Sequence, residues 1–447
     1  MRADLARIVG DAHVLPGDDQ RYTSDQTASS AVRGIAEAVV LPGDAEEVAS
    51  IVAWCSEHGV AIVPRGGGTG WAGGAVPRGS GIVLGLERLS RVRALDPLQW
   101  RMHVEAGVTT ATVQRLAREN GLFYPPDPGA AETSQIGGNV ATNAGGPHCF
   151  KYGVTGAWVT GLEVVLAPGE VVQIGGPLRK DVAGYDLRSL LVGSEGTLGI
   201  ITAVWLRLIP PPPPARPAAA FYADAAAGAA AVERLMAAGP VPAAIEYLDA
   251  ATLRIAGGGF PAPVPDGAGF LVLTESDGAD GDLDALVAAL EEDALGPVYV
   301  ADDPVALWRW RDGVGLVVGA ERGGKLSDDI VVPVERLAEA IEETVRIGDA
   351  HGLEACSWGH AGDGNLHATF LLDAGDQLAL RRAHTAAGEV LAMALRLGGS
   401  VSGEHGIGML KNGWLQHQWP ARAVSAHRAI KDALDPDGIF NPGKKLP

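Results

Sequence analysis

The feature that most constrains this chain is a glycine-rich stretch at residues 64–74, which reads PRGGGTGWAGG. It follows the apolar run 60–63 and contains too much glycine for a regular helix or strand. Glycine opens left-handed backbone conformations, and successive N–H groups can then turn inward to form an anion-binding nest. We therefore expect a loop that binds a pyrophosphate, although a glycine-rich turn without a ligand would have the same composition.

A dinucleotide-binding fingerprint of the form GxGxxG occurs within this stretch, at Gly68, Gly70 and Gly73. In a Rossmann unit, these glycines open a helix. Here Pro77 follows instead, and residues 82–86 then read as a strand. Because no helix fits, NAD on a Rossmann unit is not favoured.

Two further glycine-rich stretches occupy residues 129–146 (GAAETSQIGGNVATNAGG) and 193–199 (GSEGTLG). Three such loops, each attached to an apolar strand, are hard to explain as surface decoration. Together, PRGGGTG, IGGNVATNAGG and GSEGTLG resemble the FAD-binding domain of the vanillyl-alcohol oxidase / p-cresol methylhydroxylase flavoproteins. Over nearly its whole length, the chain is similar to the D-2-hydroxy-acid dehydrogenase branch of that family, with its D-lactate, glycolate and D-2-hydroxyglutarate types.

The resemblance implies an α+β fold: a two-part FAD-binding domain of the p-cresol methylhydroxylase type plus an α+β cap domain with an antiparallel sheet. It also implies non-covalent FAD, because Thr69 stands where several relatives carry a flavin-linking histidine. His148 and Cys149 beside the second loop leave another attachment point open. The residues expected to contact FAD are Pro64, Arg65, Gly66, Gly67, Gly68, Thr69, Gly70, Trp71, Pro128, Ser134, Ile136, Gly137, Gly138, Asn139, Thr142, Asn143, Gly145, Gly146, Tyr152, Gly153, Glu195, Gly196, Gly199, Ile200 and Asn441.

The clearest boundary in the chain is the proline run at 210–214. A proline run is extended, semi-rigid and unable to continue a sheet. Beyond it, strand-like and helix-like runs alternate, which suggests helices on one face of an antiparallel sheet. We expect three parts: an FAD-binding domain (1–212), a cap domain with the substrate and metal site (213–397), and a C-terminal segment (398–447) that returns to the FAD domain.

Local signals place individual elements before that boundary. Asp44 can cap a helix whose first turn holds Glu46 and Glu47, and Gly59 can end it. Residues 162–174 read as a hairpin that turns at Pro-Gly.

Composition limits the partners of the protein. The 447 residues carry a formal net charge of −19, which argues against nucleic acid or an anionic membrane surface as a general partner. Three widely spaced cysteines argue against a disulfide framework and favour a reduced setting. No stretch has the apolar length of a transmembrane segment. We expect a cytoplasmic protein, with peripheral association with the inner membrane and a homodimer left open.

A second candidate centre is the motif HAGDGNLH at residues 360–367. Asp363-Gly364 is a favoured two-residue hairpin turn, which would pair 362 with 365, 361 with 366 and 360 with 367. His360 and His367 would then face each other on one side of the sheet, close enough to share a metal ion. Two imidazoles favour zinc, with manganese as the alternative, although two ordinary hairpin histidines would give the same pattern.

The resemblance adds the motif GEHGIG at 403–408, in which Glu404 corresponds to the third metal ligand and His405 to the catalytic base. The reaction implied is metal-assisted oxidation. A 2-hydroxy acid chelates the metal through its hydroxyl and one carboxylate oxygen, and His405 takes the hydroxyl proton. The C2 hydrogen leaves as hydride to the flavin, which yields a 2-oxo acid.

The substrate carboxylate needs cationic partners, and the resemblance assigns this role to Arg311 and Lys325. Solvated surface cations are the alternative for both, and their spacing departs by about one residue from that of the hydroxyglutarate enzymes. Thr369 stands where those enzymes carry asparagine, which favours a lactate-like monocarboxylate. Asn441 lies in a C-terminal segment that would fold back beside the flavin ring, unless that segment is a plain proline–glycine terminus.

The leading function is therefore FAD- and metal-dependent oxidation of a D-2-hydroxy acid. The alternatives are a metallohydrolase that uses His360, His367 and Glu404, and a non-catalytic flavin-binding subunit of a glycolate-oxidase-like complex. The sequence leaves the electron acceptor open among a quinone, a cytochrome, an electron-transfer flavoprotein and oxygen.

Overall fold

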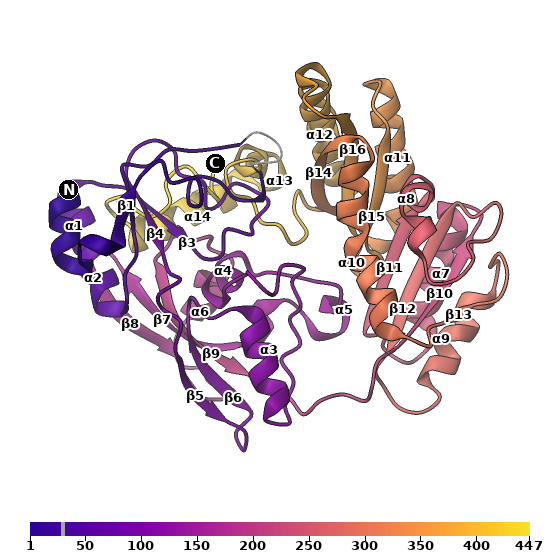
Figure 1. Cartoon of the computed structure of the whole chain (residues 1–447), viewed down its shortest axis with the longest axis horizontal. Coiled ribbons are helices and arrows are strands. Elements are labelled where there is room, and N and C mark those ends of the chain that lie inside the picture. The colour runs from indigo at the N-terminus through magenta and orange to yellow at the C-terminus, as the bar shows by residue number, and fades with distance from the viewer. Residues whose placement is uncertain (28–31) are drawn as a thin grey trace. The chain divides into compact units, whose positions relative to one another are not determined.

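The computed structural model describes residues 1–27 and 32–447 (Figure 1). The chain divides into two compact units, each made of separate stretches. Unit 1 contains Met1–Gly145, Val154–Pro211 and Glu404–Pro447, and unit 2 contains Gly146–Gly153 and Pro212–Gly403. The proline run thus lies where the chain passes from unit 1 into unit 2.

The first part of unit 1 is a four-stranded sheet in the order β1-β2-β4-β3. Strands β2, β4 and β3 are parallel, and β1 is antiparallel to β2. Helix α2 (Ala45–His58) packs in the core of this sheet. Asp44 caps its N-terminus, because the Asp44 side chain accepts a hydrogen bond from the Glu47 amide, and Gly59 caps its C-terminus in the left-handed region. The bounds are α1 (Arg2–Val9), β1 (Val14–Pro16), β2 (Ala38–Val40), β3 (Ile62–Arg65) and β4 (Ile82–Gly85).

The second part of unit 1 is a five-stranded antiparallel sheet in the order β5-β6-β9-β7-β8. The hairpin expected at 162–174 is β7–β8, whose last pair is Leu166 with Glu170. The bounds are β5 (Val92–Asp96), β6 (Arg101–Glu105), α3 (Thr110–Glu119), α4 (Ile136–Thr142), β7 (Val159–Leu166), β8 (Glu170–Gly175), α6 (Leu187–Leu191), β9 (Ile200–Arg207), α13 (Leu415–Gln418) and α14 (Ala421–Leu434).

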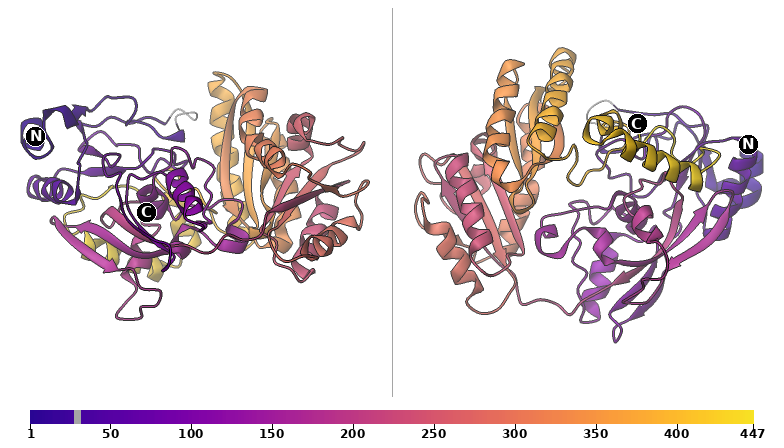
Figure 2. Two further views of the ribbon diagram at one scale, coloured as in Figure 1. Left: turned by 60° about the horizontal axis from the view of Figure 1, so that its bottom comes forward. Right: turned by 180° about the vertical axis from the view of Figure 1, so that it is seen from behind.

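Unit 2 is built on a seven-stranded sheet in the order β13-β10-β12-β11-β15-β16-β14, and all its neighbouring strands are antiparallel. Helices α11 and α12 lie side by side against it (Figures 1 and 2). The bounds are α5 (Cys149–Tyr152), β10 (Arg216–Tyr222), α7 (Ala225–Ala237), β11 (Ala244–Asp249), α8 (Ala250–Ala256), β12 (Phe270–Ser276), α9 (Asp282–Glu291), β13 (Tyr299–Val300), α10 (Pro304–Glu321), β14 (Gly323–Val331), α11 (Leu337–Ala350), β15 (Ala355–His360), β16 (Asn365–Asp373) and α12 (Gln377–Arg396).

Helices cover both faces of this sheet, so the expectation of helices on one face is wrong. Leu271 of β12 packs in one cluster with Leu307 and other residues of α8 and α10. Its neighbour Phe270 points to the opposite face, where it closely approaches Gly228 of α7. The central strands are buried along their whole length, and a strand buried on both sides shows no polar alternation that would reveal a second helical layer.

One mixed sheet and one antiparallel sheet in unit 1, together with an antiparallel sheet and its helices in unit 2, confirm the expected α+β class. One local expectation is corrected: the second glycine-rich stretch is not a continuous loop, because Ile136–Thr142 forms helix α4. No helix within residues 1–27 and 32–447 combines the length and apolar character needed to cross a bilayer.

Candidate functional site

The three glycine-rich stretches meet in unit 1, where the first and second pack backbone against backbone. A Cβ on Gly66 would lie 3.3 Å from the Cα of Gly138, and a Cβ on Gly67 would lie 2.1 Å from the carbonyl oxygen of Thr133. The third stretch approaches the first, because a Cβ on Gly196 would lie 2.3 Å from Pro64 Cγ. A side chain at Gly67 would collide with backbone, and one at Gly66 or Gly196 would force a neighbour to shift, so the sequence pattern reflects a real packing requirement.

The C-terminal segment is bonded to the third stretch within the same unit. The Glu195 carboxylate accepts from the amides of Ile407 and Gly408 at 2.8 and 2.6 Å. Asn441 is almost fully buried, and its Nδ2 donates to the carbonyls of Gly74 and Glu195 at 3.0 and 2.8 Å. The segment is therefore part of the glycine-loop centre, and a plain terminus does not describe it.

Several buried polar atoms at this centre suit a bound polar cofactor. Gln135 Oε1, Ser194 Oγ and Asn441 Oδ1 have no hydrogen-bond partner within residues 1–27 and 32–447. Buried acceptors and hydroxyls are normally paired, so these atoms mark where a ligand could complete the site. Together with the close glycine backbones, they make this centre the candidate cofactor site of unit 1.

Most residues expected to contact FAD lie in unit 1, but Gly146, Tyr152 and Gly153 belong to unit 2. The Tyr152 hydroxyl donates there to Asp277, which also pairs with Lys151. Arg65 is buried and donates to the carbonyls of Ser24 and Arg21, both at 2.7 Å, so its guanidinium serves the local fold. These side chains have structural partners that the motifs alone did not reveal.

In unit 2, His360 and His367 lie together on the sheet face covered by α10. Their ring centroids are 5.6 Å apart, nearly perpendicular to each other. The expected direct pairing of the two is wrong: His367 pairs with Trp358, because residues 361–363 form a 3-10 turn and lengthen the connection. A register shift of two residues keeps every side chain on its face, so the two imidazoles still meet diagonally.

A buried carboxylate, Glu246, supports His360 from the neighbouring strand β11. Its Oε1 lies 2.6 Å from His360 Nδ1, and its Oε2 forms an ion pair with Arg311 of α10. Arg311 is itself buried, which excludes the solvated surface cation considered above. Its Nε has no hydrogen-bond partner among the residues that the structure describes.

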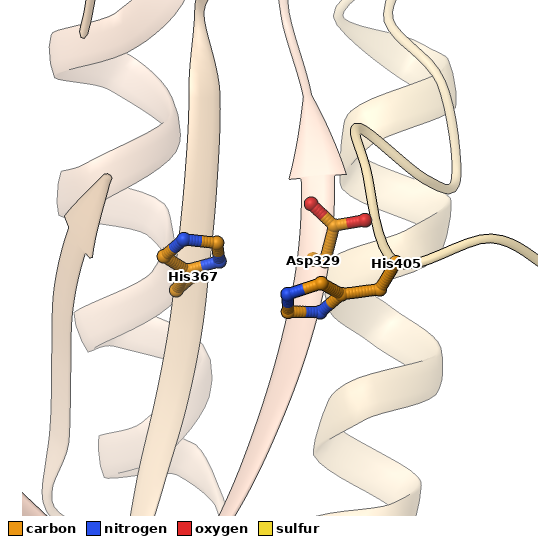
Figure 3. A group of neighbouring side chains, drawn as sticks. All are labelled: Asp329, His367 and His405. Atoms are coloured by element: carbon orange, nitrogen blue, oxygen red, sulfur yellow. The ribbon is translucent and has the colours of Figure 1, made fainter. Parts of the chain in front are cut away.

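Asp329 lies opposite His367 in the pairing of β14 with β16, and Figure 3 shows the two side chains on these strands. Its Oδ2 accepts from the Gly403 amide at 2.8 Å and the Ser402 hydroxyl at 2.9 Å, and its Oδ1 accepts from Asn365 Nδ2 at 2.7 Å. Asp329, which faces His367, thus also binds the chain at Gly403, immediately before Glu404.

Lys325 lies on the same face of β14, with Nζ 2.7 Å from the Gly315 carbonyl of α10 and 5.0 Å from the Trp358 ring centre. Burial lowers the pKa of its ammonium group. Lys325 is therefore a partly buried cation on the sheet face that carries the two histidines.

Thr369 lies on the same face of β16. It is fully buried, and its hydroxyl is 2.7 Å from that of Ser327.

His405 belongs to unit 1, where its ring stacks with Trp71 of the first glycine-rich stretch at 6.0 Å between centroids. His405 Nε2 lies 3.6 Å from a Glu404 carboxylate oxygen.

His148, considered as a flavin attachment point, belongs to unit 2, where its Nε2 lies 2.8 Å from a carboxylate oxygen of Glu275.

Sequence reasoning missed two residues that hold the site, Glu246 and Asp329. A signal was present for Glu246, which interrupts the mostly apolar strand AIEYLD, but Asp329 lies in GGKLSDDIV among other polar residues and does not stand out. A charge within a buried strand requires a partner. The sequence alone, however, does not say which distant residue that partner is.

Two family profiles match the chain: "FAD binding domain" over residues 36–175 and "FAD linked oxidases, C-terminal domain" over residues 211–445. The chain is 35% identical to the glycolate oxidase subunit GlcD of Bacillus subtilis (strain 168), covering 99% of this chain and 96% of that protein. It is 36% identical to a D-2-hydroxyglutarate dehydrogenase of Xanthomonas citri pv. viticola, covering 96% and 93%. A D-lactate dehydrogenase of Anaerostipes hadrus is 32% identical, with 96% and 94% covered.

Among solved structures, p-cresol methylhydroxylase with substrate bound is similar in fold, with a TM-score of 0.80 and 19% identity over 99% of this chain and 96% of that one. A 4-ethylphenol oxidase from Gulosibacter chungangensis has a TM-score of 0.76 and 20% identity, covering 100% and 96%. At such low identity, these similarities concern the fold alone. The chain therefore belongs to the FAD-linked oxidases, as an enzyme of the 2-hydroxy-acid dehydrogenase branch with a p-cresol methylhydroxylase-type FAD-binding fold.

Proposed function

We propose that the protein oxidises a D-2-hydroxy acid, lactate-like in preference, with non-covalent FAD and a divalent metal ion held by His360, His367 and Glu404. The relatives named above as acting on glycolate, D-lactate and D-2-hydroxyglutarate support the substrate class. The single observation that carries the metal proposal is the buried histidine pair, in which Glu246 engages Nδ1 of His360, as a carboxylate commonly does for a histidine that binds metal through its other nitrogen.

Glu404 is the third ligand in this proposal because of its place in the chain. Asp329 binds the Gly403 amide and also faces His367 across β14 and β16, so the next residue starts close to the histidine pair. Two imidazoles and one carboxylate form a ligand set suited to zinc, with manganese as the alternative. Three protein ligands leave coordination positions for substrate.

The chain's own residues divide the remaining tasks. When bound, FAD supplies the hydride acceptor and the divalent ion supplies Lewis acidity. Arg311 and Lys325 bind the substrate carboxylate, and in support of this role Arg311 Nε has no hydrogen-bond partner within residues 1–27 and 32–447. His405 accepts the hydroxyl proton, since an imidazole changes its charge near neutral pH.

The preference for a lactate-like acid rests on Thr369 and its neighbours. Its hydroxyl is paired with Ser327 and donates to the His367 carbonyl at 3.2 Å. A short, engaged side chain offers less to a second substrate carboxylate than an asparagine amide would. We therefore expect D-lactate to reduce the flavin with a higher kcat/KM than D-2-hydroxyglutarate.

The test is anaerobic flavin reduction by a panel of D-lactate, glycolate, D-2-hydroxyglutarate and L-lactate. Chelation should abolish bleaching by D-lactate while the oxidised flavin spectrum persists, and zinc or manganese should restore it. Acid precipitation should leave the yellow colour in the supernatant if FAD is non-covalent. Full activity of the chelated, metal-free enzyme would contradict the metal assignment, and no bleaching by any hydroxy acid would indicate a non-catalytic subunit.

Two neighbouring variants separate the assigned roles. Glu404→Ala should lose bound metal, because it removes one of three protein ligands. His405→Ala should keep FAD and metal yet reduce turnover about a hundredfold or more, the usual scale for loss of a general base. Metal analysis and stopped-flow flavin reduction of both variants measure these effects. If His405→Ala lost the metal and Glu404→Ala kept it, the two roles would have to be exchanged.

A further inference from the structure

Glu246 is a fully buried carboxylate whose two oxygens are both engaged by residues of the proposed site. Oε1 lies 2.6 Å from His360 Nδ1, and Oε2 pairs with the Arg311 guanidinium. It lies in the middle of β11, where Glu246 pairs with His360 on one side and with Leu273 on the other. One carboxylate therefore links a proposed metal ligand with a proposed substrate-binding cation.

We propose that Glu246 is a positioning residue for the reaction: it orients His360 toward the metal ion and holds Arg311 in place for the substrate carboxylate. This inference rests on the proposed function, because it assumes that His360 binds a metal and that Arg311 binds substrate. Neither the glycine-rich motifs nor the histidine motifs point to it.

The chemistry of the contact sets the tautomer of His360. An ionised carboxylate can only accept hydrogen bonds, so Nδ1 carries the hydrogen and Nε2 presents its lone pair. Histidines that bind metals commonly donate their other nitrogen to a carboxylate, which fixes the ring orientation and raises the basicity of the ligand. Glu246 would serve His360 in this way.

The contact with Arg311 gives Glu246 its second task. A guanidinium with no partner is costly to bury, and Arg311 is only 5% exposed. Glu246 neutralises one edge of the guanidinium, while Nε stays without a partner among the residues that the structure describes. The arginine is thus held in the site with one buried donor unsatisfied.

Unit 2 provides a matched control in Glu275 of β12. Glu275 is 2% exposed and also accepts from a histidine and a second donor, His148 and Trp308. It pairs with Ala244, two residues from Glu246 on the same strand, so both carboxylates share one sheet face. Glu275 therefore contacts His148 and Trp308 rather than His360 and Arg311.

The first measurement is the zinc affinity of the FAD-loaded, substrate-free enzyme in competition with a chromophoric chelator. Glu246→Gln should weaken zinc binding by about 10–100-fold, the usual effect of losing a residue that orients a metal ligand. Glu275→Gln should leave zinc affinity within about twofold of wild type, because its histidine is not a proposed ligand. At saturating zinc, Glu246→Gln should also raise the KM for D-lactate, whereas Glu275→Gln should not. A general structural defect from losing a buried carboxylate would affect both variants alike.

A second variant guards against misfolding. Glu246→Gln combined with Arg311→Met removes both buried charges, so no unpaired ion remains, and it should show the same loss of zinc affinity. Equal zinc affinity in wild type, Glu246→Gln and the double variant would overturn the inference. A wild-type enzyme that binds no divalent ion would instead overturn the proposed function itself.

Discussion

Gly67 has no room for a side chain at the point where the first and second glycine-rich stretches meet. A Cβ there would lie 2.1 Å from a backbone oxygen, which cannot move without displacing the loop. We expect Gly67→Ala to weaken FAD binding by about tenfold or more, since overpacking typically costs about 1–3 kcal/mol. Gly129→Ala is the control, because a Cβ at Gly129 meets nothing within 4 Å. Flavin titration of both apoproteins would contradict this prediction if their affinities were equal.

Asp329 is the residue that fixes the chain just before Glu404. Its removal leaves the Gly403 amide, the Ser402 hydroxyl and the Asn365 amide without this acceptor. We expect Asp329→Ala to lower both metal occupancy and the free energy of unfolding, the latter by about 1–3 kcal/mol or more. Asp329→Asn keeps one acceptor oxygen, so its metal occupancy and free energy of unfolding should lie between those of wild type and Asp329→Ala. Denaturant unfolding and metal analysis test the graded order, and an unchanged Asp329→Ala protein would refute the anchoring role.

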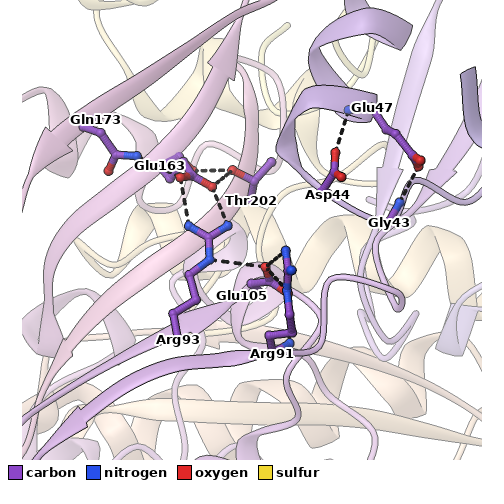
Figure 4. A network of polar contacts seen from close by, with 9 residues as sticks. All are labelled: Gly43, Asp44, Glu47, Arg91, Arg93, Glu105, Glu163, Gln173 and Thr202. Carbon is purple, nitrogen blue, oxygen red and sulfur yellow. Dashed lines mark hydrogen bonds and ion pairs between the residues drawn. The ribbon is translucent and has the colours of Figure 1, made fainter.

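At the scale of elements, a buried ionic network joins strands β5, β6, β7 and β9 of unit 1 (Figure 4). Arg93 donates to both oxygens of Glu163 at 2.9 Å and to Glu105 at 3.2 Å. Burial alone would raise the pKa of both carboxyls, but the bonds from Arg91, Arg93 and Thr202 outweigh it and lower both. The sheet depends on this arginine because two carboxylates share it.

We therefore expect Arg93→Ala to reduce the free energy of unfolding by about 3–5 kcal/mol at pH 7, the scale for leaving a buried charge unpaired. Arg91→Ala is the control: its side chain is 68% exposed, and its loss should cost about 1 kcal/mol or less. Lowered carboxyl pKa values stabilise the fold above the ordinary value near 4.5, and this stabilisation is lost as pH falls below it. Urea unfolding at pH 7 and pH 3 should show the gap between wild type and Arg93→Ala shrinking in acid; an equal gap would contradict the network's role.

The C-terminal segment contains a lysine with an unusual proton affinity. Lys444 Nζ donates to the Gly74 carbonyl at 2.8 Å and to that of Val76, and burial lowers its pKa to about 7. The unfolded chain keeps the ordinary value of about 10.4, so between about pH 7 and 10 the unfolded state binds more protons. This residue therefore makes the free energy of unfolding rise with pH across that window.

Lys444→Met removes this pH dependence. The Tm of the FAD-free wild type, relative to that of the variant, should increase between pH 6.5 and 9 because the variant lacks the titrating group. Other titrating groups cancel in the comparison. Circular-dichroism melts at several pH values measure the difference, and a constant difference would show that Lys444 does not titrate in this window.

At the scale of the whole molecule, unit 1 is completed by a segment that follows all of unit 2 in the chain. Phe440 lies in the core of the first sheet beside Ile62, and Lys431 Nζ donates to the Thr197 carbonyl at 2.7 Å. We expect a chain ending at Gly403 to lose FAD while unit 2 keeps its native hydrogen-exchange protection. Flavin content after gel filtration and exchange mass spectrometry test this, and stoichiometric FAD in the truncated chain would contradict it.

The sequence by itself determined the features that depend on local backbone chemistry. The Asp44 cap and Gly59 set the ends of α2, and the glycine-rich stretches marked positions of close backbone approach. FAD as the cofactor followed from the resemblance of these stretches to a flavoprotein family. The placement of both histidines on one face also followed from the sequence, since a two-residue slip in a strand pairing preserves the face.

Only the tertiary structure decided which distant groups neutralise the buried charges. Glu246 and His360 are 114 residues apart, and the sequence around either residue does not indicate that the two are in contact. The antiparallel sheet brings β11 beside β15, and that pairing makes Glu246 the partner of His360 and Arg311. A buried charge requires a partner, but long-range strand order chooses it, so the residues that hold the site became visible only in the folded chain.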